Sequence, residues 1–155
     1  MYQKILIAND GSELAEKAIE AGIELGKMSG AQIVMLHMGM PLIMATDMPG
    51  FQPAAYIEES GVHPANHDYA AELQASNDAV DKKVAIAEAT HGVKIEVVHV
   101  VAAEVWYTVI ENATILGCDV IVMASHGRGA LKSLLLGSET LSVLSHCKLP
   151  VLVVR

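Results

Sequence analysis

The sequence predicts an α/β protein built on an open, doubly wound, five-stranded parallel sheet with helices on both faces. Short runs rich in Val and Ile alternate along the chain with longer stretches in which apolar and small residues recur at helical spacing. Runs this apolar are typical of strands buried on both sides, and the helix-length segments between them provide the crossovers that parallel pairing requires. The 155 residues have the length of one domain, so we expect a single domain over residues 1–155.

Five strands and four helices are expected in alternation. The predicted strands are residues 5–8, 33–38, 95–101, 120–124 and 151–154. The first three helices are predicted from apolar and small residues at helical spacing, namely Ala15, Ala18, Gly22 and Leu25, then Tyr69, Leu73, Val80, Val84 and Ala87, then Val105, Val109, Ala113 and Leu116. The last helix should open at Gly137 and Ser138, with Ser138 as a candidate N-cap. In such sheets, ligands bind beyond the carboxyl ends of the strands, where the strand order reverses.

Composition and charge argue against several classes of function. A formal net charge of -8 disfavours a nucleic-acid surface, which needs clustered Lys and Arg. No apolar stretch approaches the roughly 20 residues that span a bilayer, and the few residues before the first apolar run leave no room for a signal peptide. We therefore expect a cytoplasmic protein with neither a membrane nor a nucleic-acid partner. Cys118 and Cys147 are expected to be free, partly buried thiols.

The segment after the fourth strand, residues 124–138, carries the chemistry expected of a phosphate-binding loop. Gly127 and Gly129 permit positive φ and bring bare backbone close to a ligand. Unpaired N–H groups at the start of the next helix, aided by the helix dipole, favour an anion. Arg128 and Lys132 could neutralise phosphate charge or be solvated loop residues. The alternative for the whole segment is a glycine loop that merely turns the chain.

On these residues the chain resembles the universal stress protein family over nearly its whole length. In the nucleotide-binding branch of that family, the fourth strand ends in Gly-x-x-Gly, followed by nine residues and then Gly-Ser or Gly-Thr. This chain has Gly127, nine residues, Gly137 and Ser138, with Ala124 at the first glycine position. The opening run ILIANDGS and the ending PVLVVR are also similar to the family's first and last strands.

The resemblance implies a site for an adenine nucleotide, ATP or AMP, with Mg²⁺ as a candidate ion at the phosphates. Gly127, Gly137 and Ser138 would hold phosphates, Asp10 would hold ribose hydroxyls, and Met38 would meet adenine through its backbone. Neighbouring positions complete the predicted site: Ala8, Asn9, Met123, Ala124, Ser125, Arg128, Gly129, Glu139 and Thr140. Asp10 could instead cap the turn into the first helix, because Asp-Gly-Ser is strong turn chemistry. The resemblance also places the methyl group of Ala124 against the ribose.

The histidines are expected to be structural. His126 lies in the candidate loop, but no carboxylate partner can be assigned to it, so packing or backbone hydrogen bonding is the favoured role. His63 and His67 are four apart with no further ligand evident, which disfavours a metal site. His37 and His99 lie in or beside apolar strands. The nucleotide loops of Rossmann and Walker proteins and the hydrolase elbow are missing, so no dedicated catalytic machinery is evident.

Two further segments suggest contacts with other molecules. Residues 39–66 form a long irregular stretch, which is either a variable insertion or a ligand lid or partner surface. The last strand should lie at a sheet edge, and exposed edges invite pairing with another chain. The family resemblance implies a homodimer formed by antiparallel pairing of these strands. The alternative is an edge covered by the chain's own helices.

Three functions follow from these observations. The leading hypothesis is a non-enzymatic regulator of the stress response that binds ATP or AMP. The second is a dimeric interaction module of the same family that has lost nucleotide binding, which Ala124 favours. The third is a slow ATP hydrolase with a metal-bound water near Asp10, which the lack of an identifiable acid-base pair disfavours.

Overall fold

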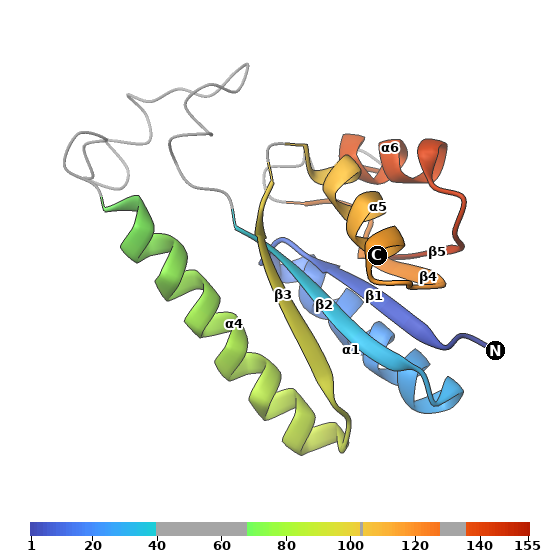
Figure 1. Cartoon of the computed structure of the whole chain (residues 1–155), viewed down its shortest axis with the longest axis horizontal. Coiled ribbons are helices and arrows are strands. Elements are labelled where there is room, and N and C mark those ends of the chain that lie inside the picture. Colours follow the sequence, from blue (N-terminus) through green and yellow to red (C-terminus); the bar gives the residue numbers. More distant parts are fainter. Residues whose placement is uncertain (40–67, 103, 128–135) are drawn as a thin grey trace.

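The structure is a computed structural model that describes residues 1–39, 68–102, 104–127 and 136–155, apart from the side chain of Tyr69. It contains a five-stranded sheet with all neighbouring strands parallel, in the order β3-β2-β1-β4-β5 (Figure 1). The strands are β1 (Lys4–Asn9), β2 (Gln32–Gly39), β3 (Ile95–Val101), β4 (Val120–Ala124) and β5 (Val151–Val154). The predicted α/β fold with a parallel sheet is confirmed.

The helices of the described ranges are α1 (Glu13–Ser29), α4 (Tyr69–His91), α5 (Val105–Ile115) and α6 (Ser138–His146). The two longest begin at a side chain that accepts a hydrogen bond from the first turn. Ser12 Oγ accepts from the backbone N–H of Ala15 at 3.2 Å, and Asp68 Oδ1 accepts from that of Ala71 at 3.0 Å. These caps fix where α1 leaves the carboxyl end of β1 and where α4 begins.

The start of α6 differs by one residue from the prediction. Its N-cap is Gly137, with φ of -72° and ψ of 158°, and Ser138 is the first helical residue. The prediction of Ser138 as the N-cap is therefore wrong, because Gly137 already holds the extended backbone that a cap position requires. No side chain among the described residues caps this helix, in contrast to α1 and α4.

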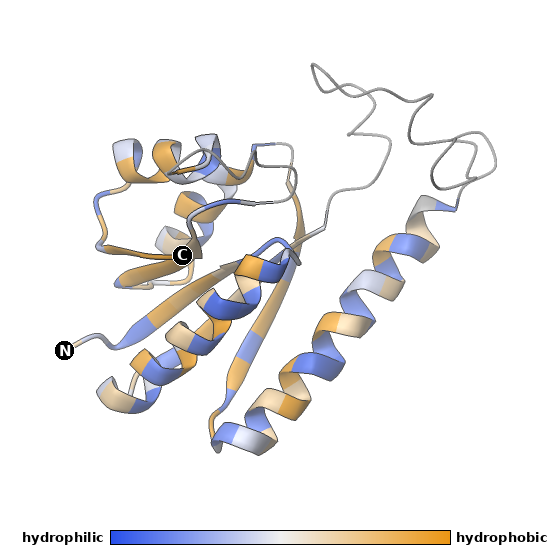
Figure 2. Cartoon of the chain, turned by 180° about the vertical axis from the view of Figure 1, so that it is seen from behind, coloured by the Kyte–Doolittle hydropathy of each residue, from blue (hydrophilic) through white to orange (hydrophobic). Residues whose placement is uncertain are grey.

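Two hydrophobic cores cover the two faces of the sheet. Successive side chains of a strand point to opposite faces, so in β1 Ile5 and Ile7 face one way and Leu6 and Ala8 the other. The first pair belongs to a core formed with α1 and α4, here called the α1/α4 core, and the second to a core formed with α5 and α6, the α5/α6 core. Helix α1 lies behind β1 and β2 in Figure 1 and in front of the strands in Figure 2, which views the molecule from behind.

The strand order reverses between β1 and β4. The chain moves outward from β1 through β2 to β3, and then returns to place β4 on the other side of β1. The carboxyl ends of β1 and β4 therefore meet at the position where doubly wound sheets bind ligands. Both ends are followed by residues that the sequence places in the predicted site.

Both cysteines are free, as predicted: Cys118 is buried and Cys147 is half-buried. Burial raises the pKa of the Cys118 thiol above its ordinary value, and Lys4 opposes this effect. In the described part of the chain, no helix combines the length and the apolar character needed to cross a bilayer.

The close approach of α1 to β1 gives a test of the α1/α4 core. A Cβ atom on Gly22 would lie 2.4 Å from Ile7 Cδ1, and Ile7 is fully buried, so a side chain at this position must displace the core. We expect Gly22→Val to lower the free energy of unfolding by about 1–3 kcal/mol through overpacking. Urea denaturation would measure the loss. Glu24→Val, which puts the same side chain at an exposed position of α1, should have a smaller effect, and equal losses would contradict the packing explanation.

Candidate functional site

Asp10 and Gly127 lie against each other where β1 and β4 end. A Cβ atom on Gly127 would be only 2.7 Å from Asp10 Oδ2, so the glycine leaves the space that this carboxylate occupies. The other carboxylate oxygen, Oδ1, accepts a hydrogen bond from the Ser12 backbone N–H at 3.0 Å. The turn into α1 thus holds one side of the Asp10 carboxylate, and the other side meets the backbone of Gly127. The structure therefore brings together two predicted site residues that are far apart in the sequence.

Gly137 lies beside the same residues at the far end of the glycine-bounded segment. Its N–H donates to the carbonyl of Ser125 at 2.8 Å. A Cβ atom on Gly137 would lie 3.4 Å from both His126 Cα and the Ser125 oxygen, at the short end of ordinary van der Waals contact. The first turn of α6 therefore starts directly beside the residues that follow β4. The predicted residues Arg128 and Gly129, and also Lys132, fall outside the described residues.

Thr140 anchors the first turn of α6 to the end of β4. Its side chain is 2% exposed, and its hydroxyl donates to the backbone oxygens of Ala124 at 3.0 Å and of Ser125 at 3.2 Å. Since the hydroxyl has a single hydrogen, both carbonyls share it. Thr140 was predicted to be a ligand contact. Its hydroxyl proton instead bonds the backbone at the end of β4 and so holds the first turn of α6 against that strand.

Glu139 has a role that the sequence did not suggest. Its Oε2 accepts a hydrogen bond from the backbone N–H of Trp106 at 2.8 Å, in the first turn of α5. The N-cap residue of α5, Glu104, makes no side-chain hydrogen bond to that turn. Glu139 therefore caps α5 from α6, and its charge also suits the positive end of the helix dipole. No local sequence signal marks a cap that comes from 33 residues away.

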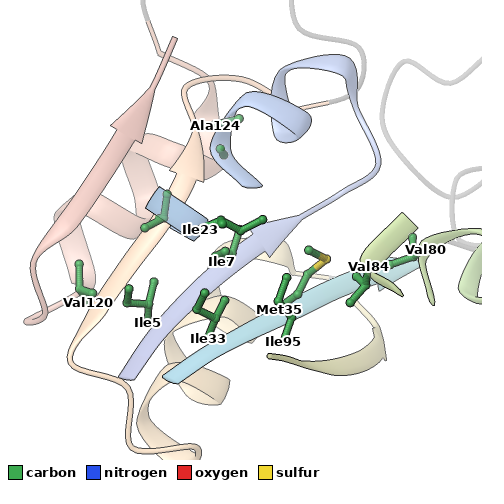
Figure 3. Close-up of a cluster of buried hydrophobic side chains, with 12 residues drawn as sticks. Ile5, Ile7, Ile23, Ile33, Met35, Val80, Val84, Ile95, Val120 and Ala124 are labelled. Carbon is green, nitrogen blue, oxygen red and sulfur yellow. The ribbon is translucent and has the colours of Figure 1, made fainter. Parts of the chain in front are cut away.

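Ala124 belongs to the α1/α4 core. Its side chain is buried there with Val120 and Val122, which share its face of β4. Figure 3 shows Ala124 and Val120 on this side of the sheet. The φ angle of Ala124 is not positive; among the described residues, only glycines have positive φ. The extra methyl group relative to glycine is thus accommodated by packing in the interior against the α1 side of the sheet.

The remaining predicted residues divide between the two faces of the sheet. Ala8, Met38 and Met123 are buried in the α5/α6 core. Met38 lies beyond the last register pair of β1 with β2, which joins Asn9 to His37, so it extends past the end of β1. The side chain of Asn9 instead faces the α1/α4 side, where it donates to Met35 Sδ at 3.7 Å.

His37 and His99 make hydrogen bonds to α4, and His126 makes one to the preceding residue. Ser125 Oγ lies 2.8 Å from His126 Nδ1, and the Ser125 side chain is almost fully buried. His37 Nε2 lies 3.2 Å from the hydroxyl of Ser76 on α4, and His99 Nε2 lies 2.9 Å from a carboxylate oxygen of Asp81 on the same helix. Among the described residues, no group of three or more His, Cys, Asp or Glu could hold a metal ion. The pair at positions 63 and 67 lies outside the described residues.

Comparison with known proteins identifies the family. A model of the Universal stress protein family matches residues 1–155, which is the whole chain. The chain belongs to the universal stress protein family. The chain is 30% identical over 158 residues to universal stress protein YxiE of Bacillus subtilis, and the match covers all of both chains. Among solved structures, it resembles MJ0577 of Methanocaldococcus jannaschii at a TM-score of 0.74 and 26% identity, covering 99% of this chain and 96% of the other.

Two further universal stress proteins of the same fold were solved with nucleotides. One, in complex with cAMP, has a TM-score of 0.58 and 23% identity, over 99% of this chain and 97% of the other. The second, from Archaeoglobus fulgidus in complex with dAMP, has a TM-score of 0.62 and 16% identity, over 99% and 98%. These two likenesses show the shared fold.

The Thr140 anchor gives a test of how the site is held together. Thr140→Val keeps the shape of the buried side chain but leaves the carbonyls of Ala124 and Ser125 without the hydroxyl. We expect it to lower the free energy of unfolding by about 1–3 kcal/mol, because the Ala124 carbonyl loses the hydroxyl as its donor while the Ser125 carbonyl keeps the Gly137 N–H. Thr114→Val, which removes a hydroxyl from an exposed site on α5, is the matched control and should cost less in the same urea titration.

Proposed function

We propose that this universal stress protein binds ATP or AMP beyond the carboxyl ends of β1 and β4, and that it acts as a regulator of the stress response without being a dedicated enzyme. The observation that carries the proposal is the contact between Asp10 and Gly127. This contact sets the Asp10 carboxylate, a strong acceptor for ribose hydroxyls, beside the backbone of a glycine, which has no side chain. Both lie at the reversal of strand order, where this class of sheet binds nucleotides.

The start of α6 supports the phosphate half of the proposal. The first N–H groups of a helix have no partner within the helix and must be satisfied from outside. Ser12 and Asp68 serve this purpose for α1 and α4, and Glu139 serves it for α5. In the described structure, α6 has no such side-chain cap. A phosphate group fits this position, because the N–H groups and the helix dipole both favour an anion.

The solved relatives support the adenine half of the proposal. Universal stress proteins of this fold bind cAMP and dAMP, both of which carry adenine. Met38 extends past the end of β1 on the neighbouring strand, which is where the proposal places the adenine base. Mg²⁺ would be held mainly by the phosphates and water, as this ion usually is in nucleotide sites.

The nucleotide proposal has a direct test. Protein purified without added nucleotide, then denatured, should release an adenine nucleotide that chromatography can detect. Added ATP with Mg²⁺ should raise the melting temperature, since a ligand at 100 times its Kd stabilises a fold by about 2.7 kcal/mol. If no nucleotide is released and ATP leaves the melting temperature unchanged, the chain is an interaction module without nucleotide binding, the second hypothesis.

A pair of variants at Gly137 locates the site. Gly137→Asp puts a carboxylate at the start of α6, where it would repel phosphate, so we expect it to abolish the ATP-dependent shift in melting temperature. Gly137→Ala adds only the Cβ atom, 3.4 Å from His126 Cα, and should keep most of the shift. Equal shifts in both variants would place the phosphates elsewhere.

ATP turnover that persists through further purification but disappears in Asp10→Asn would instead support a slow hydrolase.

We also propose that the protein forms a homodimer through β5. This strand is the last in the sheet and pairs with β4 on one side only. Its Leu152 is 41% exposed, which is typical of an edge that a second copy covers. Antiparallel pairing of two such edges is self-complementary, as twofold symmetry requires.

A charge on the strand edge tests the dimer. Leu152→Lys should shift the protein from dimer to monomer in sedimentation-velocity experiments, because edge lysines oppose strand pairing. Ile86→Lys, which changes an equally apolar and more exposed residue on α4, should leave the dimer intact. A wild-type protein that remains monomeric at high concentration would overturn the assignment.

A further inference from the structure

A second concave site lies on the opposite side of the sheet from α5 and α6. A groove of about 440 Å³ separates α1 from α4 and opens onto the sheet between them. Its apolar walls come from Ile23 of α1, Met35 of β2, and Val80 and Val84 of α4, and Figure 3 shows both valines beside Met35. This volume lies within the range of small-molecule sites, which are mostly apolar with a few fixed polar groups.

Three polar side chains of this groove lie together near the carboxyl ends of β1 and β2. Asn9 and His37 are register partners on β1 and β2, they are 4% and 1% exposed, and both line the groove. Ser76 of α4 also lines it, with its hydroxyl 3.2 Å from His37 Nε2. At the rim, Lys83 of α4 forms an ion pair with Glu16 of α1. The site therefore has apolar walls, a buried polar end and a charged rim.

The amide of Asn9 fixes which kind of group the polar end can receive. Its Oδ1 accepts from the Gly11 N–H at 2.8 Å, so the two N–H donors of Nδ2 must lie on the other side of the amide. Within the described chain these donors find one acceptor, the Met35 thioether at 3.7 Å, which is a weak one. A buried donor without a good acceptor is unfavourable, and an oxygen supplied by a ligand would satisfy it.

We propose that this groove is a second ligand site, for a small uncharged molecule with an apolar body and a carbonyl-type acceptor. The acceptor binds the Asn9 amide, and the body packs along Ile23, Met35 and the α4 valines. A cation lacks the acceptor that Asn9 requires. An anion is disfavoured because Lys83, the one lysine among the described residues that line the groove, is already paired with Glu16, while Glu20 adds a further negative charge to the lining.

The groove is separate from the proposed nucleotide site but is joined to it through the backbone. Asn9 holds the Gly11 N–H, and Asp10, whose carboxylate meets Gly127, lies between these two residues. An acceptor bound to the Asn9 amide would thus contact the same side chain that shapes the Asp10 turn. The groove shares Asn9 with the predicted nucleotide site, but its apolar walls come from α1, β2 and α4, so the second site does not depend on nucleotide binding.

Two probes of matched size test the groove. Acetophenone carries a carbonyl group, and ethylbenzene has the same ring without it. In ¹H–¹⁵N spectra of the whole protein, we expect both to shift the backbone amides of Ile23 and Val84. Only acetophenone should shift the side-chain amide signals of Asn9. If acetophenone at its solubility limit moves none of these signals, or moves the groove amides without those of Asn9, the proposal is overturned.

A pair of variants on α4 locates the binding. Ala79 lines the groove near Ser76, so Ala79→Phe should fill it and abolish the acetophenone shifts at Ile23 and Val84. Ala85→Phe adds the same ring to the exposed part of α4 outside the groove lining and should leave the shifts unchanged. Undiminished shifts in the Ala79 variant would overturn the location. The comparison of the two probes needs only the wild-type protein, so it stands even if Ala79→Phe fails to fold.

Discussion

The parallel pairing of β1 with β4 is the interaction on which the rest of the structure depends. Register pairs such as Ile5 with Val120 and Ile7 with Val122 join strands that are more than a hundred residues apart in the chain. This pairing unites the half of the sheet that leads outward to β3 with the half that ends at β5. It also brings the carboxyl ends of β1 and β4 together, so that Asp10 can meet Gly127. Without it, neither core nor site could form, because each includes residues from both halves.

Ser125 is the point at which the elements around the β4 end are joined. Its N–H donates to the Val154 oxygen at the end of β5 at 2.7 Å, and its own carbonyl accepts from Gly137 N–H and from the Thr140 hydroxyl. The residue is 1% exposed, so these bonds form where water does not compete. The edge strand and the start of α6 are therefore both hydrogen-bonded to the backbone of one buried residue. The start of α6 is linked to the end of β5 through two hydrogen bonds of Ser125, one from the Gly137 N–H and one to the Val154 oxygen.

Alternating apolar runs and helical spacing were sufficient to predict the five strands and three of the four described helices, because the crossovers of a parallel sheet leave a strong local pattern. The last helix, α6, was predicted from Gly137 and Ser138 at its start. The faces of the strands were harder to predict. Both faces of β1 and β4 are buried, so hydrophobicity does not alternate along them, and the inward packing of Ala124 and the position of Asn9 on the α1/α4 side leave no trace in the sequence. The capping of α5 by Glu139 depends on tertiary contact and had no local signal either.

Polar side chains are distributed unevenly along the strands: the amino ends bury apolar residues, and the polar residues lie toward the carboxyl ends. Toward the amino ends, β1 and β2 bury only apolar side chains, such as Ile5 and Ile33 in the α1/α4 core. Toward the carboxyl ends, the same face carries the register partners Asn9, His37 and His99. His37 and His99 contact Ser76 and Asp81 of α4, and Asn9 lines the groove. Burying polar groups weakens the driving force for folding unless each is paired. The apolar ends can hold the fold while the carboxyl ends keep polar groups for the two proposed sites, on the edge beside Asp10 and within the groove beside α4.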